Sequence, residues 1–234
     1  MIDFIRSLFE SAFKTNSSLE FAVLTGCLRI SKESIFTGMN NLEIISILNK
    51  NYDEYFGFTE EEIKKICIDY KIESKYDLMK ERYNGYIFGS VNVYNPWSII
   101  RFVKDMKADE NAFPSSYWAN TSSNSIVRKM IERADDDTKE EIEALIEGKT
   151  IEKPIHEDIT YDEVYKTMDN LWNFMFFTGY FKKISERMDD NTQQHYAELM
   201  IPNKEVKYIF RTKILSWFQE KIEEKDLSQV PYPK

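Results

Sequence analysis

The stretch of sequence that decides the fold is 21-FAVLTGCLRISKESIFTGMNN-41. It opens with a nearly unbroken apolar run, Phe21 to Leu24, which stops at Thr25. Such a run is typical of a strand that is buried on both faces of a parallel sheet. In open α/β folds, ligands bind just beyond the carboxyl ends of these strands. We therefore expect Thr25, Arg29 and Lys32 to lie where a bound phosphate would be met.

The same loop also has a simpler interpretation. Most strand-Thr-Gly turns are only turns, in which glycine supplies a positive φ, and most arginines and lysines in such loops are solvated. Taken alone, the loop favours this simpler interpretation. A phosphate-sensing role therefore needs support from the rest of the chain.

The composition describes a folded acidic protein. The 234 residues suggest one large domain or two small ones, since a domain usually has about 100–200 residues. Hydrophobic residues make up 42% and aromatic residues 15% of the chain, which is enough for a sizeable core. The net charge of −9 weighs against a large non-specific nucleic-acid surface, because phosphate binding uses a basic face.

The cysteines and histidines are too few for a structural metal site or a disulfide framework. The chain has Cys27, Cys67, His156 and His195, whereas a structural zinc site needs four ligands at characteristic spacing. No apolar run approaches the roughly 20 residues of a membrane span, and no signal peptide is recognisable. We expect a cytoplasmic protein that has no metal ligands and no membrane partner.

Helical periodicity, caps and turn residues define the remaining elements. Thr59 with Glu62 forms a capping box, Asn95 precedes a helix that starts with Pro96, and Gly148 is a helix C-cap. We expect helices at about 2–14, 60–70, 76–83, 96–104, 125–134, 139–147, 171–179 and 205–223, and short strands at 21–25, 86–89, 180–184 and 196–201.

This pattern predicts a mostly α fold with a few short strands, that is, an α+β protein. The strand, turn, strand and long helix between residues 180 and 223 indicate a winged-helix-like part on a helical base. Trp97 and Trp118 are expected to be core anchors, because aromatic side chains dominate burial in helical domains. The strand that should precede the first helix in a βαβ unit is absent, so we expect the chain to start in mid-domain.

Few residues suggest catalytic chemistry. Gly148-Lys149-Thr150 resembles the end of a P-loop, but Glu143 stands where that motif needs a second glycine. Glu-x-Lys triplets, which could belong to a metal-dependent nuclease, occur at Glu62/Lys64, Glu205/Lys207 and Glu223/Lys225 and are common on charged helix surfaces. No Ser-His-Asp set and no acidic strand end for magnesium is legible. We therefore assign no catalytic residue and no metal ligand.

Several segments, taken in order, resemble the signatures of one family. They are LTGCLRISKESIFTGMNNL, YFGFTEEEI, ERYNGYIFG, VYNPWSII, YWANTSSNSIV, LWNFMFFTGYF and LMIPNKEVKYIF. In that order they are similar to the bacterial AAA-ATPase-like family, predicted P-loop ATPases that are often followed by a PD-(D/E)XK-type nuclease-like domain. The resemblance covers nearly the whole chain.

The resemblance implies a partial ATPase. Family members begin with a P-loop segment and a Walker-B-like strand, and this chain is similar to the part after that strand. It implies a C-terminal remnant of the ATPase core at 1–50, a helical lid domain at 51–150 and a winged-helix-like domain at 151–234. The missing partners would be the N-terminal P-loop segment and the C-terminal nuclease-like domain. ATP and Mg would bind the intact family protein, and neither is expected to bind this chain tightly.

The resemblance also assigns roles within the loop. Thr25 would end the sensor strand and face the γ-phosphate, while Arg29 and Lys32 would stabilise charge on the transferring phosphoryl group. The expected function is nucleotide-state sensing and coupling, without ATP hydrolysis by this chain alone.

An alternative function is a non-catalytic helical and winged-helix module that binds a protein partner or nucleic acid. A basic stripe on the last predicted helix, at Lys207, Arg211, Lys213 and Lys221, favours weak nucleic-acid binding. An exposed edge of the strand at 21–25 would invite self-association into a homo-oligomer.

Overall fold

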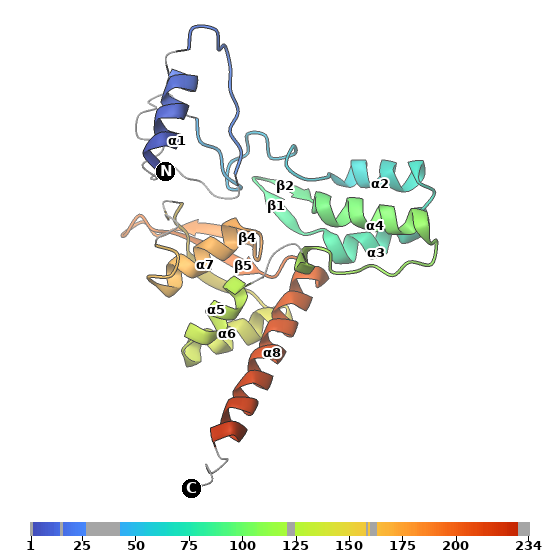
Figure 1. Ribbon diagram of the computed structural model, residues 1–234, viewed down its shortest axis with the longest axis vertical. Helices are drawn as coiled ribbons and strands as arrows, with labels where there is room; N and C mark the ends of the chain where they lie inside the picture. The colour runs from blue at the N-terminus through green and yellow to red at the C-terminus, as the bar shows by residue number, and fades with distance from the viewer. Residues whose placement is uncertain are drawn as a thin grey trace.

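The computed structural model describes residues 2–14, 16–26, 43–120, 125–157, 159 and 163–228. The fold is mostly helical, with a few short antiparallel strands (Figure 1). This confirms the predicted α+β class. In chain order the elements are α1 (Ile2–Phe9), η1 (Glu10–Lys14), α2 (Glu60–Asp69), η3 (Glu73–Lys75), α3 (Tyr76–Tyr83), β1 (Tyr86–Phe88), β2 (Val91–Val93), α4 (Pro96–Ala108), η4 (Trp118–Asn120), α5 (Ser125–Arg133), α6 (Asp136–Glu147), β3 (Ile151–Pro154), α7 (Met168–Phe177), β4 (Lys182–Met188), β5 (His195–Met200) and α8 (Lys204–Ser228).

The helix ends lie where the local capping chemistry predicts them. Thr59 and Glu62 make the full capping box at the start of α2, and the Asn95 side chain accepts hydrogen bonds from the first turn of α4. Gly148 ends α6 in the left-handed conformation that favours glycine. Asp135 caps α6, so this helix starts earlier than we expected, at Asp136.

One hydrophobic core is formed by α2, α3 and α4. Its buried centre includes Ile63, Met79, Tyr83, Ile99 and Phe102. The short β1–β2 hairpin lies beside these helices (Figure 1). Tyr94, which follows β2, is buried in this core and pairs in an isolated antiparallel bridge with Phe58.

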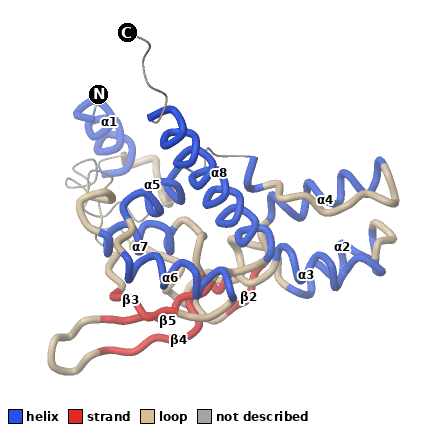
Figure 2. Tube along the Cα trace, turned by 90° about the horizontal axis from the view of Figure 1, so that it is seen from below, coloured by secondary structure: helices blue, strands red, loops and turns tan. Residues whose placement is uncertain are grey.

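A second core lies between α5 to α8 and a three-stranded antiparallel sheet of order β3-β5-β4. Figure 2 shows α5, α6 and α7 on one side of this sheet. Its buried residues include Met130, Leu145, Trp172, Leu199 and Phe210. The hairpin residues Tyr86 and Val93 belong to this core, whereas Tyr94, directly after the hairpin, belongs to the first.

The expected buried strand at Phe21 to Leu24 is wrong. This segment has no strand pairing with any described residue, and Phe21 is 78% and Val23 68% exposed. The hydrogen bonds of a strand are made to its neighbours, and the described part of the chain offers no neighbouring strand here. Apolar character alone therefore does not build a sheet.

Trp97 is not the core anchor that we expected. It lies in the first turn of α4 and is 48% exposed, whereas Ile99 and Phe102 form the buried face of that helix. Trp118, by contrast, is partly buried and packs against the second core, with its ring 4.8 Å from that of Tyr180. The domain boundaries at residues 50 and 150 stay predictions. None of the described helices is long and apolar enough to cross a membrane.

Candidate functional site

The residues predicted to sense nucleotide are not brought together in the described part of the chain. Thr25 is exposed and directly follows the segment Phe21 to Leu24, which is neither helix nor paired strand. Arg29 and Lys32 lie outside the described residues. Their roles therefore stay predictions.

The described residues instead converge around a buried carboxylate, that of Glu205. This residue lies in the first turn of α8 and is fully buried. Its Oε2 accepts a hydrogen bond of 2.7 Å from Ser98 Oγ in α4, and its Oε1 accepts one of 2.9 Å from the backbone N–H of Trp118 in η4. One side chain thus joins α8, η4 and α4. Because α8 packs in the second core and α4 in the first, Glu205 links the two cores.

A second set of contacts lies at the same junction. Asn203 donates from Nδ2 to the carbonyl oxygen of Asn84 at 3.0 Å, and its Oδ1 caps the start of α8 through the N–H of Val206. Gly85, directly after Asn84, has a φ of +104°. A Cβ at this position would lie 2.2 Å from the carbonyl oxygen of Pro202. The backbones of the two turns therefore meet too closely for any other residue at position 85.

The pKa of Glu205 is raised, chiefly because burial disfavours its charged form. The Trp118 N–H, the Ser98 hydroxyl and the positive charge of Arg82 oppose this shift. The Nε of Arg82 is itself buried and makes no hydrogen bond with any described residue. A carboxylate at a helix N-terminus is also favoured by the helix dipole.

We call this cluster the Glu205 junction: Asn84, Gly85, Ser98, Trp118, Asn203 and Glu205. These residues come from four separate stretches of the chain, around residues 81–89, 93–100, 117–127 and 199–210. The junction is closed and packed, so it is suited to holding α4, η4 and α8 in one relative position.

Sequence reasoning missed Glu205 and treated it as part of a surface Glu-x-Lys triplet. A signal was present, because Glu205 precedes the apolar Ile209 by four residues, a spacing that places both on one face of a helix. Both Glu205 and Glu62 are occupied, the first in the buried junction and the second in the α2 cap. Glu205 therefore uses both carboxylate oxygens within the fold, whereas Glu62 uses only Oε2.

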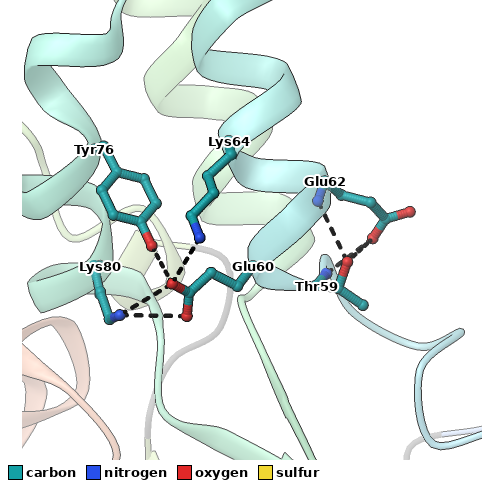
Figure 3. Close-up of polar contacts among 6 residues, drawn as sticks. All are labelled: Thr59, Glu60, Glu62, Lys64, Tyr76 and Lys80. Atoms are coloured by element: carbon teal, nitrogen blue, oxygen red, sulfur yellow. Dashed lines mark hydrogen bonds and ion pairs between the residues drawn. The ribbon is translucent and has the colours of Figure 1, made fainter.

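An exposed ion-pair cluster, shown in Figure 3, ties α2 to α3. Glu60 Oε1 accepts a hydrogen bond of 2.5 Å from the Tyr76 hydroxyl, and the carboxylate contacts Lys64 and Lys80 at 3.3 Å. The hydroxyl of Tyr76 and the two lysines lower the pKa of Glu60 to about 2. The cluster stabilises the charged carboxylate and has the character of a brace between two helices.

The two histidines lie at a hollow of about 260 Å³ beside β5. His156, Glu157, Glu186, His195 and Tyr196 are among the residues that line it. Across the described ranges, no group of three or more His, Cys, Asp or Glu side chains is arranged to hold a metal ion.

Comparison with known proteins gives one distant similarity. No family model matches the sequence, and no solved structure matches it. An uncharacterized protein encoded in the 5′ region of vnfD in Azotobacter chroococcum mcd 1 is 31% identical over 98 residues. The matched region covers 42% of this chain and 19% of that relative, so the chain spans only a small part of the relative's length.

Proposed function

We propose that this chain is the nucleotide-coupling part of an AAA-ATPase-like protein and does not hydrolyse ATP alone. The observation that carries the proposal is the exposure of the segment Phe21 to Leu24. Its side chains are apolar, yet each is exposed and the segment pairs with no described strand. Burying such side chains is worth about 1.5–3 kcal/mol each, so a segment of this kind is suited to packing against a sheet supplied by another segment.

The exposed face of α1 supports the same proposal. Phe4 and Leu8 are exposed on this helix, which lies near the segment Phe21 to Leu24 in Figure 1. A helix and an apolar segment that the described residues leave exposed are what a P-loop core would leave behind if its other strands were supplied from elsewhere.

The Glu205 junction supports a coupling role. It fixes α8 against α4 through buried hydrogen bonds, so a displacement of one core would be passed to the other. Under the proposal, residues 51–150 act as the lid, and residues 151–234, which include β4, β5 and α8, act as the winged-helix-like part. The P-loop segment would hold ATP and Mg, and Thr25, Arg29 and Lys32 would meet the γ-phosphate.

The partners implied are the P-loop segment and a nuclease-like domain. An ATPase of this kind works where ATP is abundant, so the proposal implies the cytoplasm. Self-association through the uncovered segment at residues 21–24 belongs to the same proposal, because two apolar surfaces of this kind can cover each other.

Calorimetry and an ATP hydrolysis assay test the proposal on the chain itself. We expect no Mg-dependent turnover and no tight binding of Mg-ATP. Binding that is detectable at high protein concentration should weaken in the Arg29→Ala variant. Appreciable ATP hydrolysis by the purified chain would contradict the proposal.

A second candidate is a non-catalytic module for a protein partner or nucleic acid. Arg211 is exposed on α8, and Lys207 and Lys213 on the same helix are partly exposed, which favours the nucleic-acid form. The net charge of −9 opposes it. Binding of labelled duplex or single-stranded DNA at low salt, lost in an Arg211→Ala variant, would support this form, and absence of binding would remove it.

A further inference from the structure

A second hollow lies at the starts of α2 and α4, two helices of the first core. Its volume is about 370 Å³, and it is lined by Glu54, Tyr55, Phe56, Phe58, Glu62 and Pro96. Pockets for ligands usually have about 300–1,000 Å³, so this hollow suits one long side chain better than a large cofactor.

The aromatic side chains of the hollow are exposed on a firmly held backbone. Tyr55 is 71% and Phe56 57% exposed. Directly after them, Phe58 and Tyr94 exchange two backbone hydrogen bonds, of 3.2 and 2.8 Å. Gly57 packs so closely on β2 that an added Cβ would lie 2.6 Å from the Cβ of Val93. Exposed aromatic groups on a rigid support are typical of a binding surface.

The loop is also held on its other side. The Asp53 carboxylate accepts hydrogen bonds from the backbone N–H and the hydroxyl of Ser90, at 3.0 and 3.1 Å. The segment that carries Glu54 and Tyr55 is thus fixed at both ends. A rigid site loses less conformational entropy when it binds a ligand.

The charges around the hollow are negative. Glu54 is exposed, and Glu62 uses Oε2 to accept from the backbone N–H of Thr59 at 2.8 Å. Figure 3 shows the other oxygen of Glu62 pointing away from Thr59, so it can accept a further hydrogen bond. Lys64, on the same helix, is paired with Glu60. The N-termini of α2 and α4, which carry the partial positive charge of the helix dipole, also lie at the hollow. The acidic first turn of α2 offsets this positive charge.

Next to the hollow, an arginine of the chain already stacks on an exposed aromatic ring. The guanidinium carbon of Arg101 lies 5.7 Å from the centre of the Trp97 ring, one turn along α4. A planar guanidinium stacks on aromatic faces and donates two hydrogen bonds to a carboxylate, which a compact ammonium group cannot match.

We propose that the hollow binds an arginine side chain presented by a partner protein. The guanidinium would lie against Tyr55 and Phe56 and donate hydrogen bonds to Glu54 and Glu62. A protein partner fits because exposed Trp97 and Ile100 extend the apolar surface along α4 beyond the hollow. Nucleic acid does not fit, because its phosphates would meet carboxylates. This inference concerns a different surface and goes beyond the coupling function proposed above.

The test is a fluorescence-anisotropy titration of the whole chain with a labelled Ala-Arg-Ala-Arg-Ala peptide. The matched peptide replaces both arginines with citrulline, which keeps the shape and removes the charge. We expect the arginine peptide to bind and the citrulline peptide to bind at least tenfold more weakly. Tyr55→Ala should weaken arginine-peptide binding by roughly three- to tenfold, the range of one exposed-to-buried cation–π contact.

Control variants separate the hollow from the general negative charge of the chain. Tyr70→Ala removes a comparable exposed tyrosine at the far end of α2, where it contacts Lys107, and should leave peptide binding unchanged. Glu54→Gln should weaken binding, whereas Glu61→Gln changes the charge equally outside the hollow and should not. The mutated positions are exposed, and unaltered far-ultraviolet circular dichroism will verify that each variant folds.

The proposal is overturned if the arginine peptide does not bind, or if the citrulline peptide binds equally well. It is also overturned if Tyr55→Ala and Tyr70→Ala, or Glu54→Gln and Glu61→Gln, have the same effect. That outcome would mean that peptide binding follows the net charge and not the hollow.

Discussion

Replacing Glu205 with alanine removes the acceptor of two donors, the backbone N–H of Trp118 and the hydroxyl of Ser98. A buried donor left without a partner costs about 1–3 kcal/mol. The hydroxyl can turn toward another acceptor, so the backbone N–H carries most of the loss. We expect Glu205→Ala to lower the free energy of unfolding by about 2–4 kcal/mol.

Replacing Glu205 with glutamine separates the hydrogen bonds from the charge. The amide oxygen can still accept from Trp118, and the amide nitrogen can donate to Ser98, so we expect a loss below about 1 kcal/mol at neutral pH. The pKa of Glu205 is raised in the folded state above its ordinary 4.5. Its favourable contribution is therefore complete below that value and is lost as the pH rises through the folded pKa. Glutamine does not titrate, so the stability of Glu205→Gln relative to the wild type should increase as the pH rises from 4.5 to neutral.

Urea unfolding followed by tryptophan fluorescence, from pH 4.5 to neutral, measures both effects. Glu61→Ala, on the exposed face of α2, is the control and should change stability by less than about 0.5 kcal/mol. The reasoning is refuted if Glu205→Ala is as stable as the wild type, or if Glu205→Gln is destabilised as much as Glu205→Ala.

Substitutions at three further sites, with their controls, test the local structure by the same unfolding assay. Gly85→Ala should lower the free energy of unfolding by about 2 kcal/mol or more, because its Cβ would meet the carbonyl oxygen of Pro202. Gly148→Ala, also at positive φ but with open space around it, should cost only about 1 kcal/mol. Equal losses at the two positions would contradict the close approach of Gly85 to Pro202. Thr59→Ala should lower the free energy of unfolding by about 1 kcal/mol, because it removes the cap of α2, and Thr59→Ser should retain most of that stability. An alanine variant as stable as the wild type would show that the cap contributes nothing to stability. The pKa of Glu60 is lowered to about 2, so its stabilising contribution is present above pH 4.5 and is lost as the pH falls toward 2. Glu60→Gln should therefore lose less stability than the wild type between pH 4.5 and 2. The same loss of stability in both proteins would contradict the stabilising role of the Glu60 carboxylate.

The sequence predicted best those features that depend on residues within one helical turn. The capping box at Thr59, the Asn95-Pro96 start of α4 and the Gly148 end of α6 all lie where they were expected. In each case a side chain or a glycine satisfies backbone groups a few residues away, so the distant parts of the chain do not alter the outcome.

The features that failed depend on what lies across the fold. Phe21 to Leu24 has the composition of a buried strand, but a strand also needs neighbours, and the sequence of the segment does not supply them. Trp97 is apolar and close to the buried Ile99, yet the helix turns it outward. Glu205 is charged and was therefore placed on the surface, although its partners Ser98 and Trp118 allow it to be buried.

The measurement that tests the proposed coupling role most directly is ATP turnover after mixing. The chain would be combined with a separately purified P-loop-bearing segment of an AAA-ATPase-like protein, which ends before the strand that matches Phe21 to Leu24. The account predicts that neither part hydrolyses ATP alone, that the mixture does so with Mg, and that Arg29→Ala in this chain removes the activity. A mixture with no activity, in which residues 16–26 also gain no protection from hydrogen exchange, would contradict the account.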